Sequence, residues 1–376
     1  MILFLERFLN FMVKKNSLKI AVACGGTGGH IFPGLATANI LKSRGHHVTL
    51  WLAGKDGEKK AVEYWNGDLI SIESEGFQHG FSFKSFKTIL KIVVATIKTF
   101  LEMKNRSPDV LLAMGSYASI APVLSCQLLK KPYILHEANV VPGRAVSFLS
   151  SKAECVALSF KETEKYLNTK KCEHTGMPLR NVLYEKSKDH SHKEKDSKFT
   201  ILITGGSRGA TSINQKIIDA LKNDKFKSLD FKIIHIIGNH SIDKYYDFYN
   251  ENNIHAEVFK FVHNIEDYFS TADFVISRSG ASTCFELCIF GKPSLLIPYP
   301  FAVRDHQLKN AMVLHKYGAA DVISEKNLTK IFLENYLIDI ISHPKKVTNK
   351  SDNAKKIYQQ NAANELADLV EKCVKL

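Results

Sequence analysis

Two glycine clusters stand where backbone amides can approach an anion. Residues 25–30 read GGTGGH after the apolar run 18–24, and residues 205–209 read GGSRG after the apolar run 199–204. Glycines between a strand and a helix let N–H groups meet a phosphate at the positive end of the helix. Neither cluster is GxGxxG, which disfavours a nicotinamide site, and neither has a P-loop ending. Two such loops at equivalent places predict phosphate binding from both halves of the chain.

Strands that alternate with helices must position these loops. The predicted strands are 18–24, 48–52, 110–114, 132–135 and 155–158, and then 199–204, 231–237, 274–277 and 294–298. Their alternation with helical stretches such as 33–43 and 210–221 is typical of parallel sheets. The sequence therefore predicts an α/β protein of two Rossmann-like domains that face each other across a ligand cleft.

Shifts in composition indicate the domain boundaries. Residues 184–198 are almost wholly polar, which predicts a linker. The expected segments are an N-terminal extension (1–16), an N-terminal domain (17–183), the linker (184–198), a C-terminal domain (199–352) and a C-terminal helix that packs back toward the N-terminal domain (353–376). The extension is apolar with a basic end, so it is either an interfacial anchor or a consequence of start-codon choice, since Met12 would serve equally as a start.

Bulk composition narrows the class of protein. A chain of 376 residues with 45% hydrophobic and 24% charged residues suits two globular domains and excludes wholesale disorder. The formal net charge of +13 indicates an anionic partner, which could be nucleic acid, anionic lipid or a phosphorylated substrate. Seven cysteines without a CxxC pair predict reduced thiols in a cytosolic chain. Cys284 and Cys288, one helical turn apart, favour buried packing over a metal site because no further ligand lies nearby.

An amphipathic helix is predicted within residues 81–104. Apolar residues follow helical spacing and lysines share the opposite face: Phe86, Ile89, Val93, Ile97 and Phe100 against Lys84, Lys87, Lys91 and Lys98. Such a helix suits an anionic membrane interface, where each lysine contributes about 1 kcal/mol. The alternative is a helix that packs on its own sheet and solvates its lysines, and periodicity alone favours this alternative.

Six ordered motifs give the chain a resemblance to a known family. They are GGTGGHIFPGLA (25–36), HEANVVPGRA (136–145), TGMPLR (175–180), GGSRGATSIN (205–214), SRSGASTCFE (277–286) and DHQLKNA (305–311). From residue 18 to the C-terminus the chain resembles the bacterial UDP-N-acetylglucosamine–N-acetylmuramyl-(pentapeptide) pyrophosphoryl-undecaprenol N-acetylglucosamine transferases. The resemblance implies the GT-B fold and inverting transfer of N-acetylglucosamine from its UDP donor to the 4-hydroxyl of the muramyl group of lipid I, giving lipid II. It implies neither a metal nor another cofactor.

The resemblance also assigns binding residues. For the donor, Ser207 and its loop hold the leaving UDP, Arg180 lies near the diphosphate, and Glu286 accepts the ribose hydroxyls. The remaining donor residues are Val262 at the uracil, Ala281, Ser282 and Thr283 at a helix start, and His306 and Gln307 at the phosphate and sugar hydroxyls. The acceptor residues are Thr27, Gly28, Gly29 and Asn139. The turn at 115–122 departs from the family, which usually has a second glycine where Ser116 stands and a proline nearer Ser119.

Two residues are candidates for the base that an inverting transfer needs. His30 follows the first glycine loop, and an imidazole titrates near neutral pH and can accept a hydroxyl proton. The alternative is that His30 only shapes the loop. Glu137, beside His136, is the second candidate, and a structural role is equally open to it. The sequence does not decide between them.

The resemblance favours a peripheral protein on the cytoplasmic face of the bacterial cell membrane. The family carries its membrane patch at residues 81–104, and an acceptor tethered to undecaprenyl requires the enzyme to come to the bilayer. UDP-N-acetylglucosamine, lipid I, an anionic membrane surface and cell-wall synthesis proteins are the expected partners. A nucleic-acid partner is disfavoured because the positive charge is dispersed and no RRM, KH or helix-turn-helix signature is present. The rival enzyme is a UDP-N-acetylglucosamine 2-epimerase, which shares the two-domain architecture and needs no lipid acceptor.

Overall fold

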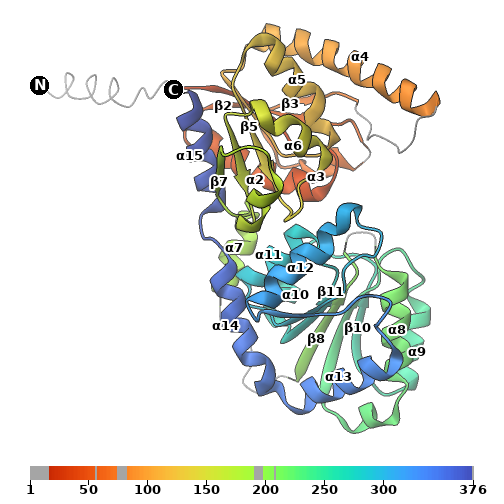
Figure 1. The fold of residues 1–376 in the computed structure, drawn as a ribbon. Coiled ribbons are helices and arrows are strands. Elements are labelled where there is room, and N and C mark those ends of the chain that lie inside the picture. The colour runs from red at the N-terminus through yellow and green to blue at the C-terminus, as the bar shows by residue number, and fades with distance from the viewer. Residues whose placement is uncertain (1–16, 56, 74–82, 190–197, 207–208, 375–376) are drawn as a thin grey trace, which may run out of the picture. The chain divides into compact units, whose positions relative to one another are not determined.

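The computed structural model describes all residues except 1–16, 56, 74–82, 190–197, 207–208 and 375–376. By their contacts the described residues form two compact units (Figure 1). Unit 1 comprises Met1–Ala138, Pro142–Pro178 and Asn361–Leu376, and unit 2 comprises Asn139–Val141 and Leu179–Gln360. The chain thus leaves unit 1 twice, briefly at 139–141 and then for the whole of 179–360.

Unit 1 is built on a seven-stranded parallel sheet with the order β3-β2-β1-β4-β5-β6-β7. The strands are β1 (Lys19–Ala23), β2 (His47–Leu52), β3 (Asp68–Ser71), β4 (Val110–Ala113), β5 (Tyr133–Glu137), β6 (Cys155–Leu158) and β7 (Cys172–His174). Strand order reverses between β1 and β4, and ligands of such sheets bind at the carboxyl ends of the strands at this switch point. The loops after β1 and β4 carry residues 25–29 and 115–116.

Helices cover both faces of this sheet. They are α2 (Gly28–Ser43), α3 (Glu58–Ala61), α4 (Phe83–Arg106), α5 (Ile120–Leu129), α6 (Arg144–Leu149) and α15 (Ala362–Val374). Leu112 of β4 belongs to a buried cluster with α2 and α15, whereas its neighbour Leu111 belongs to a second cluster with α4 and α5. Because successive side chains of a strand point to opposite faces, the two clusters lie on opposite sides of the sheet.

Unit 2 repeats the architecture with a six-stranded parallel sheet of order β10-β9-β8-β11-β12-β13. The strands are β8 (Phe199–Thr204), β9 (Phe231–Ile236), β10 (His255–Phe259), β11 (Phe274–Ser277), β12 (Ser294–Leu296) and β13 (Ala320–Val322). Its switch point lies between β8 and β11, so the loops 205–210 and 278–280 meet there. The two parallel sheets confirm the predicted two-domain α/β fold.

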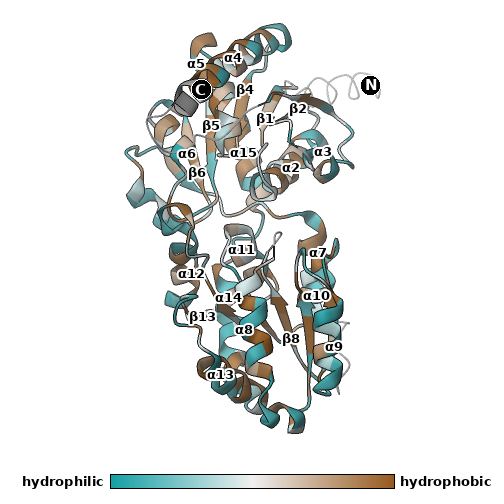
Figure 2. Ribbon diagram, turned by 90° about the vertical axis from the view of Figure 1, so that its right-hand side faces the viewer, coloured by the Kyte–Doolittle hydropathy of each residue, from teal (hydrophilic) through white to brown (hydrophobic). Residues whose placement is uncertain are grey.

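The helices of unit 2 flank its sheet. They are α7 (Asn181–Lys188), α8 (Thr211–Leu221), α9 (Asp243–Glu251), α10 (Ile265–Thr271), α11 (Ala281–Ile289), α12 (His306–Lys316), α13 (Lys330–Ser342) and α14 (Thr348–Ile357). Helices α8, α9 and α13 share one buried cluster with β8, β9 and β11. Figure 2 shows the apolar colour along β8 and the polar colour over much of α9, as expected for a helix that buries one face.

The structure differs from the predicted segments at two boundaries. Helix α7 runs into the predicted linker and belongs to unit 2, because Leu183 is buried there. The predicted C-terminal helix 353–376 is in fact two helices, α14 and α15, which belong to different units. Asn361 lies between them with a φ of 69°, a left-handed conformation that an α-helix cannot continue through. Helix α15 then packs on α2 within unit 1.

Candidate active site

The first glycine loop turns tightly at the end of β1. A Cβ at Gly25 would collide with the backbone nitrogen of Ala53, and Gly26 has a φ of 118°. The Gly26 N–H donates to Oε1 of Glu58 at 2.6 Å, and Oε2 of Glu58 accepts the N–H of Lys55 at 3.2 Å. One amide of the predicted phosphate loop is therefore taken by a buried carboxylate of the protein itself. Sequence reasoning missed Glu58, which stands in an unremarkable charged run.

The predicted acceptor residues Thr27, Gly28 and Gly29 form the start of α2. The N–H of His30 donates to the Thr27 carbonyl at 2.9 Å, so the hydrogen bonding of the helix begins with His30. The N–H groups of Gly28 and Gly29 have no hydrogen-bond partner within the described part of the chain. Free amides at the start of a helix attract negative charge, so this remains a suitable place for an anionic or polar acceptor group.

His30 is held in place by its own loop. Its Nδ1 lies 2.9 Å from Oγ1 of Thr27, which leaves Nε2 as the nitrogen available to a ligand. The ring packs beside Gly115, where an added Cβ would lie 3.7 Å from Cδ2 of His30. Part of the residue is exposed, but burial of most of the imidazole lowers the pKa of His30 to about 4. The ring is therefore neutral at neutral pH and can accept a proton.

The neighbouring pair His136 and Glu137 is buried at the end of β5. Nε2 of His136 lies 3.0 Å from Oγ of Ser159, and burial lowers the pKa of His136 to about 3. Oε2 of Glu137 accepts the N–H of Gly143 at 2.8 Å, and the residue is only 4% exposed. Oε2 of Glu137 thus supports the loop that contains Gly143, in line with the structural alternative for this residue, and its role as a base stays a prediction.

Ser116 stands in the turn after β4, at the position where the family usually has a second glycine. Its φ is 63°, in the left-handed region that favours glycine. Its hydroxyl donates to the Gly25 carbonyl at 2.8 Å and accepts the N–H of Ala118 at 3.1 Å. The side chain thus joins the two loops at the switch point of unit 1, which a glycine would leave unlinked.

Asn139 lies with unit 2, although it was predicted among the acceptor residues of the N-terminal domain. The fully buried Asn310 of α12 holds it there: Nδ2 of Asn310 donates to Oδ1 of Asn139 at 3.1 Å and to the Ser279 carbonyl at 3.2 Å. Oδ1 of Asn310 accepts the Val140 N–H at 3.0 Å. Asn310 stands in the DHQLKNA motif, but only the fold reveals which groups it binds.

Replacing Asn310 by leucine should therefore destabilise unit 2. Leucine has a similar volume but can satisfy none of the three hydrogen bonds, so the buried Val140 N–H is left without a partner. We expect a loss of about 2 kcal/mol in the free energy of unfolding, measured by urea denaturation. Asn349→Leu at an exposed position of α14 is the matched control. Equal unfolding midpoints for the two variants would contradict this role.

The start of α11 faces the switch point of unit 2 and contains three predicted donor residues. Ala281 is buried, and Ser282 and Thr283 are half-buried. No acidic residue stands in the first turn and Gly280 caps it without a side chain. The positive end of this helix is thus open to a diphosphate.

His306 and Gln307 are the first two residues of α12, a helix that packs against α11. Nδ1 of His306 lies 2.9 Å from the Val303 carbonyl, so in the neutral ring Nε2 is left as an acceptor. Oε1 of Gln307 accepts the Tyr299 N–H at 2.9 Å, which leaves its amide nitrogen as a donor. Oγ of Ser279 donates to the Gln307 carbonyl at 2.8 Å and so joins this helix start to the loop after β11.

Glu286, one turn into α11, has a carboxylate without a hydrogen-bond partner among the described residues. Burial raises the pKa of Glu286 to about 7; the positive charge of Arg180 opposes this shift, and the negative charge of Glu266 adds to it. Nη2 of Arg180 lies 3.4 Å from Oε2 of Glu266. Arg180 is thus paired with Glu266, and its positive charge also acts on Glu286, the predicted ribose ligand.

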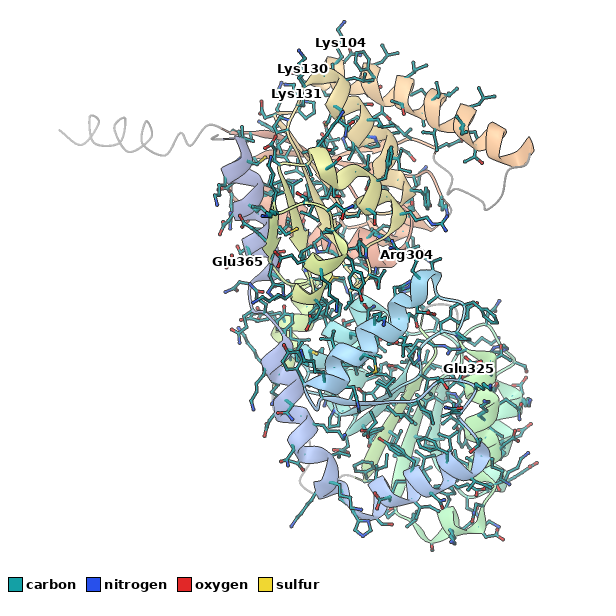
Figure 3. All side chains as sticks on the ribbon, viewed as in Figure 1. Lys104, Lys130, Lys131, Arg304, Glu325 and Glu365 are labelled. Carbon is teal, nitrogen blue, oxygen red and sulfur yellow. The ribbon has the colours of Figure 1, made fainter. Side chains whose placement is uncertain are left out.

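A second ion pair, unnoticed in the sequence, joins the loop after β11 to the segment after β13. Nη2 of Arg278 lies 2.6 Å from Oε2 of Glu325, which is labelled in Figure 3. Ser212, in the first turn of α8, donates to Oε1 of the same carboxylate, and Lys216 donates to its backbone carbonyl at 2.6 Å. The start of α8 and the loop after β11 are thereby fixed to each other.

The structure gives less information about the two other predicted donor residues, Ser207 and Val262. Ser207 lies outside the described residues. Val262 is half-buried and follows β10 at the carboxyl edge of the sheet. Within unit 1 the structure brings together Thr27, Gly28, Gly29 and His30. Within unit 2 it brings Arg180 to Glu286, and Gln307 to the loop that leads into α11.

Comparisons with known proteins agree with this architecture. The glycosyltransferase family 28 N-terminal domain matches residues 20–158, and the family's C-terminal domain matches residues 200–370. A relative from Thermodesulfovibrio yellowstonii, named UDP-N-acetylglucosamine–N-acetylmuramyl-(pentapeptide) pyrophosphoryl-undecaprenol N-acetylglucosamine transferase, is 35% identical over 87% of this chain and 91% of its own. The crystal structure of Acinetobacter baumannii MurG covers 94% of this chain and 99% of its own, with a TM-score of 0.77 and 27% identity.

A Listeria monocytogenes structure named for UDP-N-acetylglucosamine 2-epimerase also matches, with a TM-score of 0.70 over 95% of this chain and 96% of its own. At 13% identity this likeness shows the fold alone. The curated relative shares far more of the sequence. The chain belongs to the UDP-N-acetylglucosamine–N-acetylmuramyl-(pentapeptide) pyrophosphoryl-undecaprenol N-acetylglucosamine transferases, within glycosyltransferase family 28.

Proposed function

We propose that this chain transfers N-acetylglucosamine, with inversion, from UDP-N-acetylglucosamine to the 4-hydroxyl of the muramyl group of lipid I, giving lipid II for peptidoglycan. The observation that carries the proposal is the open helix start at each switch point, at α2 in unit 1 and at α11 in unit 2. Family membership supports the reaction, since the relative's name states the same donor sugar and the same undecaprenyl-linked acceptor.

The donor side of the proposal depends on a carboxylate, a helix start and polar side chains of unit 2. The two oxygens of the Glu286 carboxylate match the two neighbouring ribose hydroxyls. The N–H groups at the start of α11 suit the diphosphate. Gln307 offers its amide nitrogen and His306 its Nε2 to sugar hydroxyls, because their other polar atoms are already engaged. Arg180 contributes positive charge from beside the ribose site.

The transfer itself exchanges one bond for another. The 4-oxygen of the acceptor attacks the anomeric carbon, the bond from that carbon to the β-phosphate oxygen breaks, and UDP leaves with the electron pair. We assign the hydroxyl proton to Nε2 of His30, in the neutral tautomer whose Nδ1–H donates to Oγ1 of Thr27. The negative diphosphate of the acceptor would raise the His30 pKa toward the range in which a general base works well.

Glu286→Ala tests the donor assignment. Loss of the carboxylate removes both ribose hydrogen bonds, so we expect UDP-N-acetylglucosamine to bind about 1–3 kcal/mol more weakly by calorimetry. Glu334→Ala, at a half-buried glutamate of α13, is the matched control. Unaltered donor affinity in Glu286→Ala would remove Glu286 from the ribose site.

Helix α4 supports attachment to a membrane surface. The residues it buries include Thr88, Ala95, Thr99 and Met103, and Sδ of Met103 lies 3.7 Å from Sγ of Cys126 in α5. The large apolar side chains lie outward and are 48–55% exposed: Ile89, Leu90, Val93, Val94, Ile97 and Leu101. A contiguous exposed apolar surface marks an interaction site. Helix α4 thus packs on its own unit through these buried residues, and its exposed apolar face supports attachment to a bilayer.

This face of α4 differs in detail from the predicted one. Phe100 is half-buried rather than exposed, and the side chains of Lys84, Phe86 and Lys87 lie outside the described residues. Lys91 and Lys98 are exposed. Figure 3 shows Lys104, Lys130 and Lys131 gathered near the carboxyl ends of α4 and α5. These charges favour an anionic membrane.

Among the described helices none has the length and apolarity to cross a bilayer. The proposal places the chain at the cytoplasmic face of the cell membrane, held by α4 and by its undecaprenyl-linked substrate. Contacts with other cell-wall synthesis proteins remain a prediction of the family resemblance.

The reaction is tested directly by incubating the chain with radiolabelled UDP-N-acetylglucosamine and a lipid I analogue in the presence of EDTA. A labelled disaccharide lipid is the expected product. Conversion of the donor to its manno epimer without transfer would contradict the proposal and support the epimerase alternative.

A further inference from the structure

Glu325 follows β13 and binds groups from two other elements at the carboxyl edge of the unit 2 sheet (Figure 3). Its Oε2 lies 2.6 Å from Nη2 of Arg278 in the loop after β11. Its Oε1 accepts the hydroxyl of Ser212, and its backbone carbonyl accepts Nζ of Lys216 at 2.6 Å, both from α8. The side chains of Glu325 and Arg278 are only 20% and 12% exposed. Removing one partner of such a shielded pair leaves the other charge without compensation.

Arg278 divides its guanidinium between this carboxylate and the segment after β12. Its Nη1 donates to the Ile297 carbonyl and to the Pro298 carbonyl, both at 3.2 Å. The guanidinium carbon also lies 5.4 Å from the centroid of the Tyr299 ring. Hydrogen bonds from a planar, charged guanidinium have a fixed geometry and are stronger than those between neutral groups. The position of residues 297–299 therefore depends on Arg278.

The segment after β12 in turn orients Gln307 at the start of α12. The Tyr299 N–H donates to Oε1 of Gln307 at 2.9 Å, which leaves the amide nitrogen as the group for a ligand. Ser279, the neighbour of Arg278 in the chain, donates from its Oγ to the Gln307 carbonyl at 2.8 Å. A continuous series of contacts thus leads from the Glu325 carboxylate through Arg278 to both the side chain and the backbone of Gln307.

We propose that Glu325 is a positioning residue of the donor site: it holds the Arg278 guanidinium against the carbonyls after β12, and so fixes the Tyr299 N–H that orients the Gln307 amide toward the donor sugar. This role rests on the proposed function of Gln307 as a sugar ligand. Glu325 acts through Arg278 and does not bind the donor. Its effect should therefore be confined to the sugar and spare the nucleotide.

The variant Glu325→Gln removes the charge and keeps the shape of the side chain. Burial acts to raise the pKa of Glu325, but the hydrogen bond from Ser212 and the positive charge of Arg278 outweigh it, so the pKa is lowered and the carboxyl is ionised at neutral pH. Glutamine still accepts the Ser212 hydroxyl, so the tie to α8 is kept. The loss falls on the ion pair with Arg278.

Calorimetry with two ligands, UDP-N-acetylglucosamine and UDP, tests the role of Glu325. We expect Glu325→Gln to bind UDP-N-acetylglucosamine about fivefold more weakly than the parent, and to bind UDP within about twofold of the parent's affinity. Only the first ligand has a sugar that meets Gln307. Retained binding of UDP also shows that unit 2 is folded in the variant.

A double-mutant cycle separates positioning of Gln307 from a general structural effect. Gln307→Ala should itself weaken binding of UDP-N-acetylglucosamine about tenfold. When Glu325→Gln is added to Gln307→Ala, the further loss should be less than about twofold, because the side chain that Glu325 orients is already gone. A purely structural role predicts instead that the two losses multiply.

Steady-state kinetics with a soluble lipid I analogue gives an independent measurement. In Glu325→Gln the KM for UDP-N-acetylglucosamine should rise about fivefold and kcat should stay within about twofold, as expected when an interaction common to the ground state and the transition state is weakened. Lys216→Met is the matched control, since it removes the contact from α8 to the Glu325 backbone and leaves the carboxylate with Arg278. It should keep the parent's KM and affinities.

The outcomes distinguish this role from the proposed function. Equal losses for UDP and UDP-N-acetylglucosamine in Glu325→Gln, or parental affinity for both, would overturn the positioning role and leave the proposed function intact. Multiplying losses in the double-mutant cycle would overturn it as well. Unaltered binding of UDP-N-acetylglucosamine by Gln307→Ala would instead remove Gln307 from the proposed sugar site, and the role of Glu325 with it.

Discussion

The His30→Ala variant is expected to lose about a hundredfold or more in kcat while binding UDP-N-acetylglucosamine with nearly the parent's affinity. The imidazole lies in unit 1 with Nδ1 held by Thr27 and a neutral ring, so its removal takes away the proton acceptor. The donor residues lie in unit 2, so the substitution should leave donor binding unchanged. Turnover is measured with a soluble lipid I analogue, and donor affinity by calorimetry.

Two further variants make this result interpretable. His47→Ala removes an exposed imidazole from the same unit and should leave turnover unchanged. Glu137→Gln keeps an acceptor for the Gly143 amide and should retain most activity, because Glu137 is assigned to the loop. If Glu137→Gln lost activity and His30→Ala did not, Glu137 would be the base and His30 a residue that shapes the loop.

The central strands of both sheets were predictable from sequence because each is buried on both faces. Strands β4 and β11 read as short, almost purely apolar runs, VLLA and FVIS, and every residue in them is buried. The strands that sequence reasoning missed include the edge strands β3, β7 and β10. Their residues are exposed or half-buried, so they carry little apolar pattern. Their place in the sheet is decided by pairing with a neighbour, which periodicity cannot reveal.

In the candidate site, too, the sequence revealed the local features and not the long-range contacts. Glycine loops and helix starts are local features, so the sequence placed Thr27–Gly29 and Ala281–Thr283 at the ends of strands. The partners that hold these features are distant: Glu58 binds Gly26 across 32 residues, and Glu266 reaches Arg180 across 86. No spacing rule connects such pairs. The sequence could not show that Arg180 pairs with Glu266, and the place of Arg180 near the diphosphate stays a prediction.

The apolar face of α4 carries the second large prediction. We expect the triple variant Ile89→Gln, Val93→Gln, Ile97→Gln to bind anionic vesicles about a hundredfold more weakly than the parent in a flotation assay. Each side chain is about half exposed, so insertion into lipid would remove the remaining surface from water, worth about 1 kcal/mol apiece. Glutamine is a good helix former, and these positions face outward, so the fold of unit 1 should be kept.

Activity separates loss of membrane binding from loss of catalysis. With a water-soluble acceptor analogue the triple variant should match the parent, because α4 supplies none of the proposed acceptor or donor residues. With lipid I in vesicles its rate should fall, since acceptor and enzyme no longer share a surface. Ile331→Gln, an exposed isoleucine in unit 2, controls for loss of surface hydrophobicity as such. Unchanged flotation of the triple variant would show that the exposed face of α4 serves something other than a bilayer, and membrane attachment would then have to come from another part of the chain.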